Sequence, residues 1–113
     1  MPIINYYDIQ PGVPLENQTK TTTPLAANAV WSSVIFFTEG LNKLTGSVFA
    51  NQIGTLLIEQ SNDQVNWDIS SSYSVPASDG KGFSEDILSK YTRVKYTNGA
   101  TPQTTFRLHF LFR

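Results

Sequence analysis

The last stretch of the chain, residues 91–113, constrains the fold more than any other part of the sequence. Its final strand-like segment carries four large apolar residues at every second position: Phe106, Leu108, Phe110 and Phe112. A period of two predicts a β-strand with one buried face, because successive side chains of a strand point to opposite sides. Burying such side chains contributes roughly 1.5–3 kcal/mol each, so we expect this strand in the middle of the core.

Residues 91–97 alternate in the same way and contain the β-branched and aromatic residues that strands prefer. Asn98-Gly99 tolerates positive φ angles, and Pro102 cannot donate a hydrogen bond to a neighbouring strand. The chain is therefore expected to reverse between Thr97 and Thr104. We predict that the last two strands pair with each other as a hairpin.

The remaining segments indicate further short strands separated by turns. Residues 67–75 alternate cleanly, which predicts burial of Trp67 and Ile69, and residues 44–50 and 55–60 flank a turn and predict a second hairpin. Residues 30–37 are too continuously apolar for simple alternation, which indicates burial on both faces or a bulge. About seven to nine strands without a convincing helix predict an all-β chain that forms a single antiparallel β-sandwich, jelly-roll-like.

Residues 1–28 are rich in Pro, Gly, Asn and Thr and predict an irregular N-terminal arm, with the sandwich domain over residues 29–113. The arm has too little apolar content to fold alone, yet several of its residues need a covering surface: Ile3, Ile4, Tyr6, Tyr7, Val13 and Leu15. Long irregular segments in compact domains are often functional. Two interpretations stay open: the arm lies across its own sandwich, or it reaches a neighbouring chain.

Composition excludes several classes of partner. Charged residues make up 15% of the 113 residues and the formal net charge is −1, whereas a nucleic-acid binder carries a basic patch. There is no cysteine, so packing alone must stabilise the domain. No apolar run is long enough to span a bilayer and the N-terminus lacks the pattern of a signal peptide. We therefore expect one domain, made in the cytoplasm, with neither nucleic acid nor membrane as a partner.

Few residues suggest chemistry. His109 is the only histidine and has no cysteine to share a metal with, and the polar turn around Asp63 and Asp68 matches no calcium loop. No base is placed to activate the serines of residues 70–74. We expect no catalytic residue, no metal and no cofactor. Trp31 and Tyr91 remain candidates for an aromatic platform that stacks on a sugar ring.

Two segments resemble a module of structural proteins from tailed bacteriophages. They are GTLLIEQSNDQVNWD at residues 54–68 and YTRVKYTNGATPQTTFRLHFLFR at residues 91–113, with a weaker echo in TPLAANAVWSS at residues 23–33. The resemblance covers about the C-terminal half of the chain. It carries over no catalytic residue, because the shared positions are turns and core strands.

This resemblance implies a non-enzymatic virion protein built on a β-sandwich. It favours a capsid decoration protein on the outer head surface, with the major capsid protein lattice or another virion protein as partner. A homotrimer is implied, because capsid lattices offer threefold positions. The alternative is a glycan-binding or host-adhesion module of a phage tail or baseplate.

Overall fold

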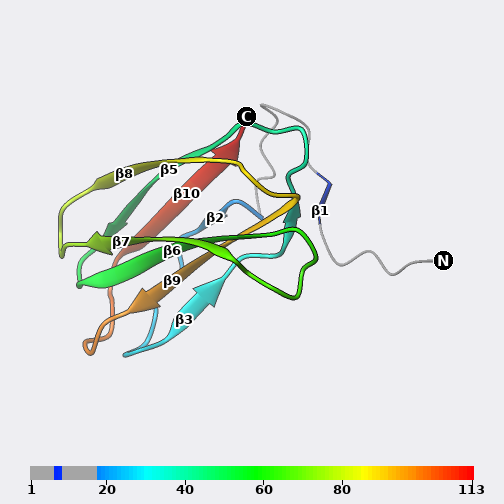
Figure 1. Ribbon diagram of the computed structural model, residues 1–113. Coiled ribbons are helices and arrows are strands. Elements are labelled where there is room, and N and C mark those ends of the chain that lie inside the picture. The colour runs from blue at the N-terminus through cyan, green and yellow to red at the C-terminus, as the bar shows by residue number, and fades with distance from the viewer. Residues whose placement is uncertain (1–6, 9–17) are drawn as a thin grey trace.

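The computed structural model describes residues 7–8 and 18–113, which form two β-sheets packed face to face (Figure 1). The strands are β1 (Tyr7–Asp8), β2 (Lys20–Thr21), β3 (Val30–Ser32), β4 (Phe36–Phe37), β5 (Lys43–Ala50), β6 (Gly54–Ser61), β7 (Ile69–Val75), β8 (Lys81–Asp86), β9 (Tyr91–Asn98) and β10 (Phe106–Phe112). Sheet A has the order β1-β4-β9-β6-β7, with β3 also on β9, and sheet B has the order β2-β10-β5-β8. Neighbours are antiparallel except β1 and β4. The predicted β-sandwich is confirmed.

Most connections carry the chain from one sheet to the other, and this overturns both predicted hairpins. Strand β9 lies in sheet A and β10 in sheet B, and β5 and β6 are separated in the same way. Strands β6 and β7 do form a hairpin within sheet A. An alternating pattern determines which face of a strand is buried. It does not determine whether the next strand in the chain lies beside it in the same sheet or opposite it in the other sheet. The two predicted pairings were therefore wrong although the strands themselves were predicted.

Polar side chains bond to the β5–β6 and β9–β10 crossovers, the connections between sheets at one end of the sandwich. The side-chain oxygen Oδ1 of Asn51 accepts hydrogen bonds from the backbone N–H groups of Thr104 and Thr105, both at 2.9 Å. In the β9–β10 crossover, the buried Asn98 amide donates to the carbonyl oxygens of Ala26 and Thr101, both at 2.9 Å. Asn98-Gly99 thus anchors a passage between sheets and does not form a tight turn within one.

Aromatic rings from both sheets fill the core. Phe110 lies 5.9 Å from Phe36, Phe112 lies 4.9 Å from Phe36, and Phe106 lies 4.7 Å from Tyr96, measured between ring centroids. All five side chains are at most 4% exposed. The predicted burial of the final strand is therefore confirmed.

The apolar segment at residues 30–37 contains the bulge that its sequence suggested. Ser32 is opposite Lys95 and Phe36 is opposite Thr92, so the three residues 33–35 oppose two residues of β9. Within the bulge the Ser33 hydroxyl accepts a hydrogen bond from the Val94 N–H at 2.9 Å. Because the segment has one residue more than β9 at this point, β3 and β4 can both pair with β9 on either side of the bulge.

Trp67 and Ile69 are half-buried and lie outside the core cluster, which corrects the prediction that they are largely buried. The regular alternation begins only at Ile69, where β7 starts. Trp67 precedes that strand, and its ring packs under the Arg93 guanidinium instead of entering the core. Farther along the same face, Val75 is fully buried, as its position predicts.

Two short pieces of the predicted arm belong to the sheets. Tyr7–Asp8 pairs in parallel with Phe36–Phe37 of the same chain, and Lys20–Thr21 pairs with β10. Thr19 also accepts a backbone hydrogen bond from Phe110 at 2.9 Å. At these points the arm lies on its own sandwich. Ile3, Ile4, Tyr6, Val13 and Leu15 fall outside the described residues.

Leu108→Ala should lower the free energy of unfolding by ~2–5 kcal/mol, because it leaves a cavity in a strand where Leu108 is 1% exposed. Chemical denaturation measures this loss. Leu88→Ala is the matched control, since Leu88 is 68% exposed, and it should change stability by less than about 0.5 kcal/mol. A loss below about 1 kcal/mol for Leu108→Ala would contradict a central position of β10.

Candidate functional site

The two residues predicted to form a sugar platform do not lie together. Trp31 is opposite Tyr96 on the inner face of sheet A and packs edge-on against Phe110, with 6.3 Å between ring centroids. Tyr91 is opposite Phe37, and their rings lie 5.7 Å apart. Because Tyr91 and Tyr96 are five positions apart on one strand, their side chains point to opposite faces. The two candidate rings therefore share no surface.

The outer face of sheet A carries a compact charged cluster. The Arg93 guanidinium stacks on the Trp67 ring at 3.9 Å from its centroid, and its Nε donates to Glu59 at 2.8 Å. Lys95 lies 3.5 Å from the same Glu59 oxygen. The three charged side chains are only 14–31% exposed. Tryptophan is the ring that binds a cation best, so the Arg93 guanidinium holds the Trp67 side chain against the sheet and covers one side of the indole.

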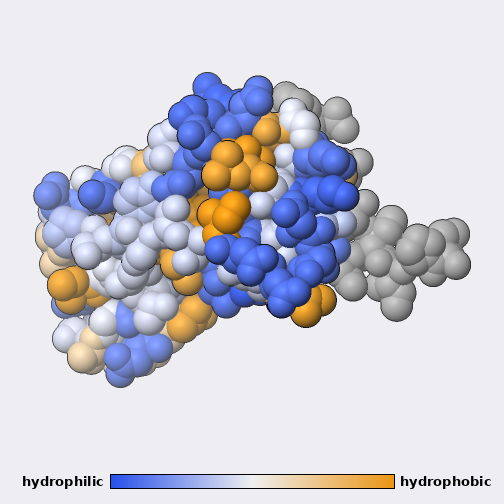
Figure 2. All heavy atoms as spheres, viewed as in Figure 1, coloured by the Kyte–Doolittle hydropathy of each residue, from blue (hydrophilic) through white to orange (hydrophobic). Residues whose placement is uncertain are grey.

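Hydroxyl-bearing residues occupy much of the remaining outer face of sheet A. The exposed members are Ser32, Thr55, Ser70, Ser72, Ser74 and Thr97. Figure 2 shows that apolar residues on the visible side form separate small groups among hydrophilic and near-neutral residues. This face offers many weak hydrogen-bonding groups and little net charge, which suits a broad protein contact better than a deep ligand site.

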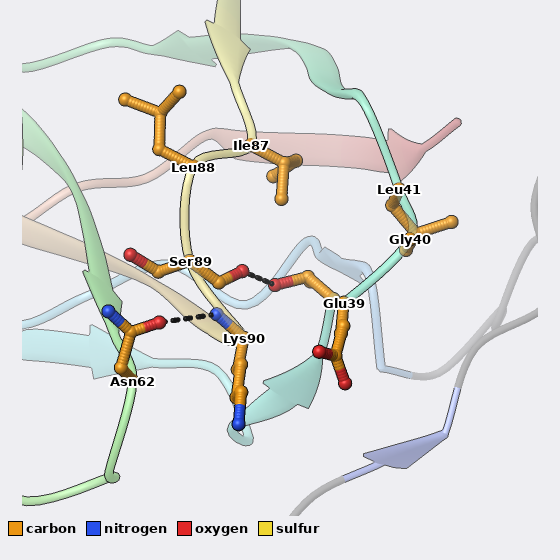
Figure 3. Close-up of a pocket in the computed structure, with 9 residues that line it drawn as sticks. Glu39, Gly40, Leu41, Asn62, Ile87, Leu88, Ser89 and Lys90 are labelled. Carbon is orange, nitrogen blue, oxygen red and sulfur yellow. Dashed lines mark hydrogen bonds between the residues drawn. The ribbon is translucent and has the colours of Figure 1, made fainter.

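A pocket of about 310 Å³ lies at one end of the sandwich (Figure 3). It is lined by residues 38–41, by residues 87–90 and by Asn62. In Figure 3 Ile87 is directed toward Leu41, whereas Leu88 points away from it. The polar lining consists largely of groups that already bond to each other: Thr38 Oγ1 donates to the Ser89 carbonyl at 3.0 Å, and Lys90 N donates to Asn62 Oδ1 at 3.2 Å.

Gln60 holds the loop beside this pocket in place. Its side chain, which is 2% exposed, donates to the Asp86 carbonyl at 2.9 Å and accepts from the Leu88 N–H at 2.7 Å and the Ser89 N–H at 3.2 Å. The loop is thus fixed in a shape that presents Leu88, 68% exposed, on the surface. This role could not be predicted from the sequence, because a glutamine inside a strand carries no distinctive pattern.

The acidic turn that could have suggested calcium is a self-contained structural turn. Asp63 accepts hydrogen bonds from Val65 N–H at 2.9 Å, Asn66 N–H at 2.7 Å and the Asn66 side-chain amide at 2.7 Å. These donors, the Asn66 backbone first, hold the pKa of Asp63 well below its usual range. Across residues 7–8 and 18–113, no three His, Asp or Glu side chains gather as a metal-binding group.

One further acidic side chain, Glu85, connects β8 of sheet B to β7 of sheet A. Glu85 accepts hydrogen bonds from the Tyr73 hydroxyl and, at 3.1 Å, from the Ser71 hydroxyl. Burial, and then the bond to Glu85, raises the pKa of Tyr73 to about 12. Both groups are therefore committed to a contact between the sheets. His109 is exposed on the outer face of β10, opposite Ser47.

No helix in the described part of the chain has the length and apolar character needed to cross a lipid bilayer.

Asp63→Ala should lower the melting temperature more at pH 7 than at pH 2. The folded pKa of Asp63 is depressed, so its contribution is complete above the unfolded value of about 3.9 and fades as the pH falls toward the folded value. Thermal unfolding of both proteins at the two pH values measures the difference. Asp68→Ala, which removes another carboxylate near the same turn, is the control. Equal destabilisation at both pH values would show that the charge of Asp63 does not stabilise the turn.

Comparison with known proteins identifies relatives of this fold. The chain is 34% identical over 70 residues to "Uncharacterized protein YqxG" of Bacillus subtilis (strain 168). The matched segment covers 61% of this chain and 24% of that protein. The crystal structure of PBSX exported protein XepA matches with a TM-score of 0.76 and 26% identity over 81% of this chain and 34% of that chain. The chain thus spans about a quarter to a third of the length of these relatives.

The family described as "Uncharacterised protein YqxG N-terminal domain" matches residues 10–112. That range includes nine of the ten strands, β2 to β10. The chain therefore belongs to the YqxG N-terminal domain family.

Proposed function

We propose that this domain is a non-enzymatic structural protein of a tailed-bacteriophage particle, bound to the outer surface of the head as a capsid decoration protein. Its partner would be the major capsid protein lattice or another virion protein, and its final location the virion. The observation that carries the proposal is the similarity, in both fold and sequence, to the phage-related protein named "PBSX exported protein XepA".

The strand order adds support. With β3 and β4 taken as one bulged strand, the order β4-β9-β6-β7 faces the order β2-β10-β5-β8. We infer that this is the order of a jelly roll, an architecture found in viral capsid proteins and in lectins. Because one fold hosts many functions, the order favours a particle or carbohydrate-binding module without deciding between them.

The chemistry of the described surface agrees with assembly. Glu59 and Arg93 bond to each other, and Glu85 bonds to Tyr73, so these carboxylates serve structural contacts. The outer face of sheet A is broad and rich in hydroxyl groups, because it spans several neighbouring strands. Such a surface can meet a repeating protein lattice over a wide area, where many modest contacts add up.

The segment before β2 is the second element of the proposal. Its apolar residues, Ile3 and Ile4 among them, would contact a neighbouring chain or the lattice, while β1 and β2 fasten the segment to both sheets. A homotrimer is the assembly we propose for this contact, because a threefold lattice position is satisfied by three equal copies.

No specific observation favours a glycan-binding or host-adhesion module over a particle protein. Trp31 faces the core, and the Trp67 ring is covered on one side by Arg93. A sugar ring stacks on an open aromatic face, and these two tryptophans do not offer a shared one.

Deletion of residues 1–17 should abolish trimer formation and reduce binding to particles that lack this protein. The deletion ends before β2, so the pairing of Lys20 and Thr21 with β10 is retained. Light scattering measures the mass of the assembly, and co-sedimentation with the particles measures binding. The full chain should sediment with the particles and the shortened chain should not.

A matched pair of variants separates the arm from a general loss of apolar surface. Ile3→Ser with Ile4→Ser should reproduce the effect of the deletion. Ile53→Ser with Leu88→Ser, at positions that are 64% and 68% exposed, should not. Failure of the full chain to bind particles would overturn the proposed function. If the shortened chain stays folded, forms an assembly of the same number of copies and binds particles equally well, the arm contacts only its own sandwich.

A further inference from the structure

The outer face of sheet B differs in charge from the rest of the chain. Strands β2, β10, β5 and β8 lie side by side in this sheet (Figure 1), and the residues that alternate with their buried side chains point outward. The Lys, Arg and Asp residues on this outer face are all exposed: Lys20, Lys43, Arg107, Arg113 and Asp86. The face thus holds half of the eight Lys and Arg residues. Its side chains carry a net charge of +3, although the formal net charge of the whole chain is −1.

Most of this positive charge is not neutralised by a neighbouring acid. Lys43 forms an ion pair with Asp86, with 2.8 Å between Nζ and Oδ1. Among the residues that the structure describes, Lys20, Arg107 and Arg113 form no ion pair. The two cations on the outer face of sheet A, by contrast, share one glutamate. Charges of both signs are enough to keep a protein soluble, whereas a field of one sign attracts a partner of opposite charge.

Three exposed side chains that can donate hydrogen bonds to an anion lie together on this face. His109 is opposite Lys20 of β2 and opposite Ser47 of β5, and Arg107 is two residues from His109 along β10. Facing residues in antiparallel strands have Cβ atoms about 4.5–5.5 Å apart, and diagonal neighbours are about 7–8 Å apart. Lys20, Arg107 and His109 are therefore close enough to contact one small group of anions together.

The aromatic ring of Phe49 restrains the Arg107 side chain. Phe49 is directly opposite Arg107, and the guanidinium carbon lies 4.4 Å from the centroid of the ring. A guanidinium presents its N–H donors in a fixed fork, which matches a carboxylate through two parallel hydrogen bonds. Because the ring contact already limits the freedom of this side chain, less conformational entropy is lost when an anion binds.

We propose that the outer face of sheet B binds an acidic surface of another protein, with Lys20, Arg107 and His109 donating hydrogen bonds to its carboxylate groups. The half-buried side chains of Phe49 and Leu111 lie between these residues and Lys43 and contribute apolar contact area. Protein interfaces are enriched in arginine and aromatic residues, and complementary charges set the orientation of the partners.

A phosphate polymer such as nucleic acid matches this face less well. A protein that neutralises many phosphates needs as many Lys and Arg side chains. This face offers three that have no acidic partner within the described part of the chain. The apolar side chains of Phe49 and Leu111 would also gain little from contact with phosphate groups, whereas they suit the mixed surface of a protein.

The contact is compatible with the assembly proposed above and does not depend on it. The outer faces of two packed sheets point in opposite directions, so a domain that meets a lattice through sheet A leaves the outer face of sheet B exposed. A trimer joined through its N-terminal segments would present three copies of this face. Several weak contacts made at the same time bind more tightly than one.

The first test uses poly-L-glutamate as the carboxylate probe, with fluorescence anisotropy of the labelled polymer as the readout. Lys20→Gln with Arg107→Gln in the full chain should raise the dissociation constant roughly 2- to 30-fold, because an exposed ion pair contributes about 0.2–1 kcal/mol. Lys81→Gln with Lys90→Gln is the matched control. It removes the same charge away from this face, since Lys81 is opposite the buried Val48 and Lys90 borders the pocket, and should leave the constant nearly unchanged.

The second test locates the contact without any substitution. NMR spectra of the full chain during a titration with poly-L-glutamate should show the largest amide shifts at Lys20, Ser47, Arg107 and His109. Residues of β6 and β7 should shift least. Addition of about 1 M sodium chloride should reverse the shifts, because the screening length falls to about 3 Å.

Four outcomes would overturn the proposal. The first is no binding of poly-L-glutamate, or largest shifts outside sheet B. The second is equal weakening by the two pairs of substitutions, which would indicate a general effect of net charge. The third is tighter binding of polyphosphate than of poly-L-glutamate at the same ionic strength, which would assign the face to a phosphate polymer. The fourth is a smaller assembly mass for the Lys20 and Arg107 variant in light scattering, which would assign the face to a second copy of the chain.

These outcomes are separate from a failure of the proposed function. The polymer probe contains no particle, so it reports on the outer face of sheet B alone. Failure of the full chain to bind particles would contradict the proposed function and leave the result with poly-L-glutamate unchanged.

Discussion

The contact between the aromatic rings of β10 and the inner face of sheet A is the interaction on which the rest of the sandwich depends. Phe110 and Phe112 meet Phe36, and Phe106 meets Tyr96, across the space between the sheets. Large aromatic side chains bury more area than any other residues, and edge-on ring packing adds to that gain. Because these rings come from strands in opposite sheets, they force the last two strands apart and set the distance between the layers.

Once the strands lie in opposite sheets, the connections between them need support at the ends of the sandwich. Backbone groups there leave the ladders and must find other partners. Asn51 and Asn98 supply them at one end, and Gln60 supplies them at the other. These three residues are polar and at most partly exposed, and each forms two or more hydrogen bonds to backbone groups of another segment. Specific hydrogen bonds therefore hold the crossovers in place.

The surfaces that result are suited to protein contacts. The outer face of sheet A combines an ordered Trp67–Arg93–Glu59 cluster with many hydroxyl groups, and its β7 edge is long and uncharged. The pocket is lined in part by residues 87–90, and its polar groups largely bond to one another, as Thr38 does to Ser89 and Lys90 does to Asn62. Leu88, another lining residue, is exposed. In the proposed role on a phage particle, these broad and weakly polar faces would contact neighbouring proteins of the lattice.

Much of this architecture could be predicted from the sequence. The alternation in residues 106–112 set the buried face of β10. The continuous apolar run at residues 30–37 indicated burial on both faces or a bulge, and the structure has the bulge. The sites were less accessible. Trp31 and Tyr91 were candidates because both are aromatic, but the registers of β3 and β9 place them on opposite faces.

The sequence by itself determined which segments are strands and which of their faces are buried, because side-chain alternation is a local property of the chain. Only the tertiary structure decided the partners. The alternation is equally compatible with a hairpin and with two strands in opposite sheets for residues 91–98 and 106–112. The same holds for residues 44–50 and 54–60. The choice depends on packing of rings between distant strands and on side chains such as Asn51 and Gln60 that bond across the ends. Those contacts join residues far apart in the chain, so no local pattern encodes them.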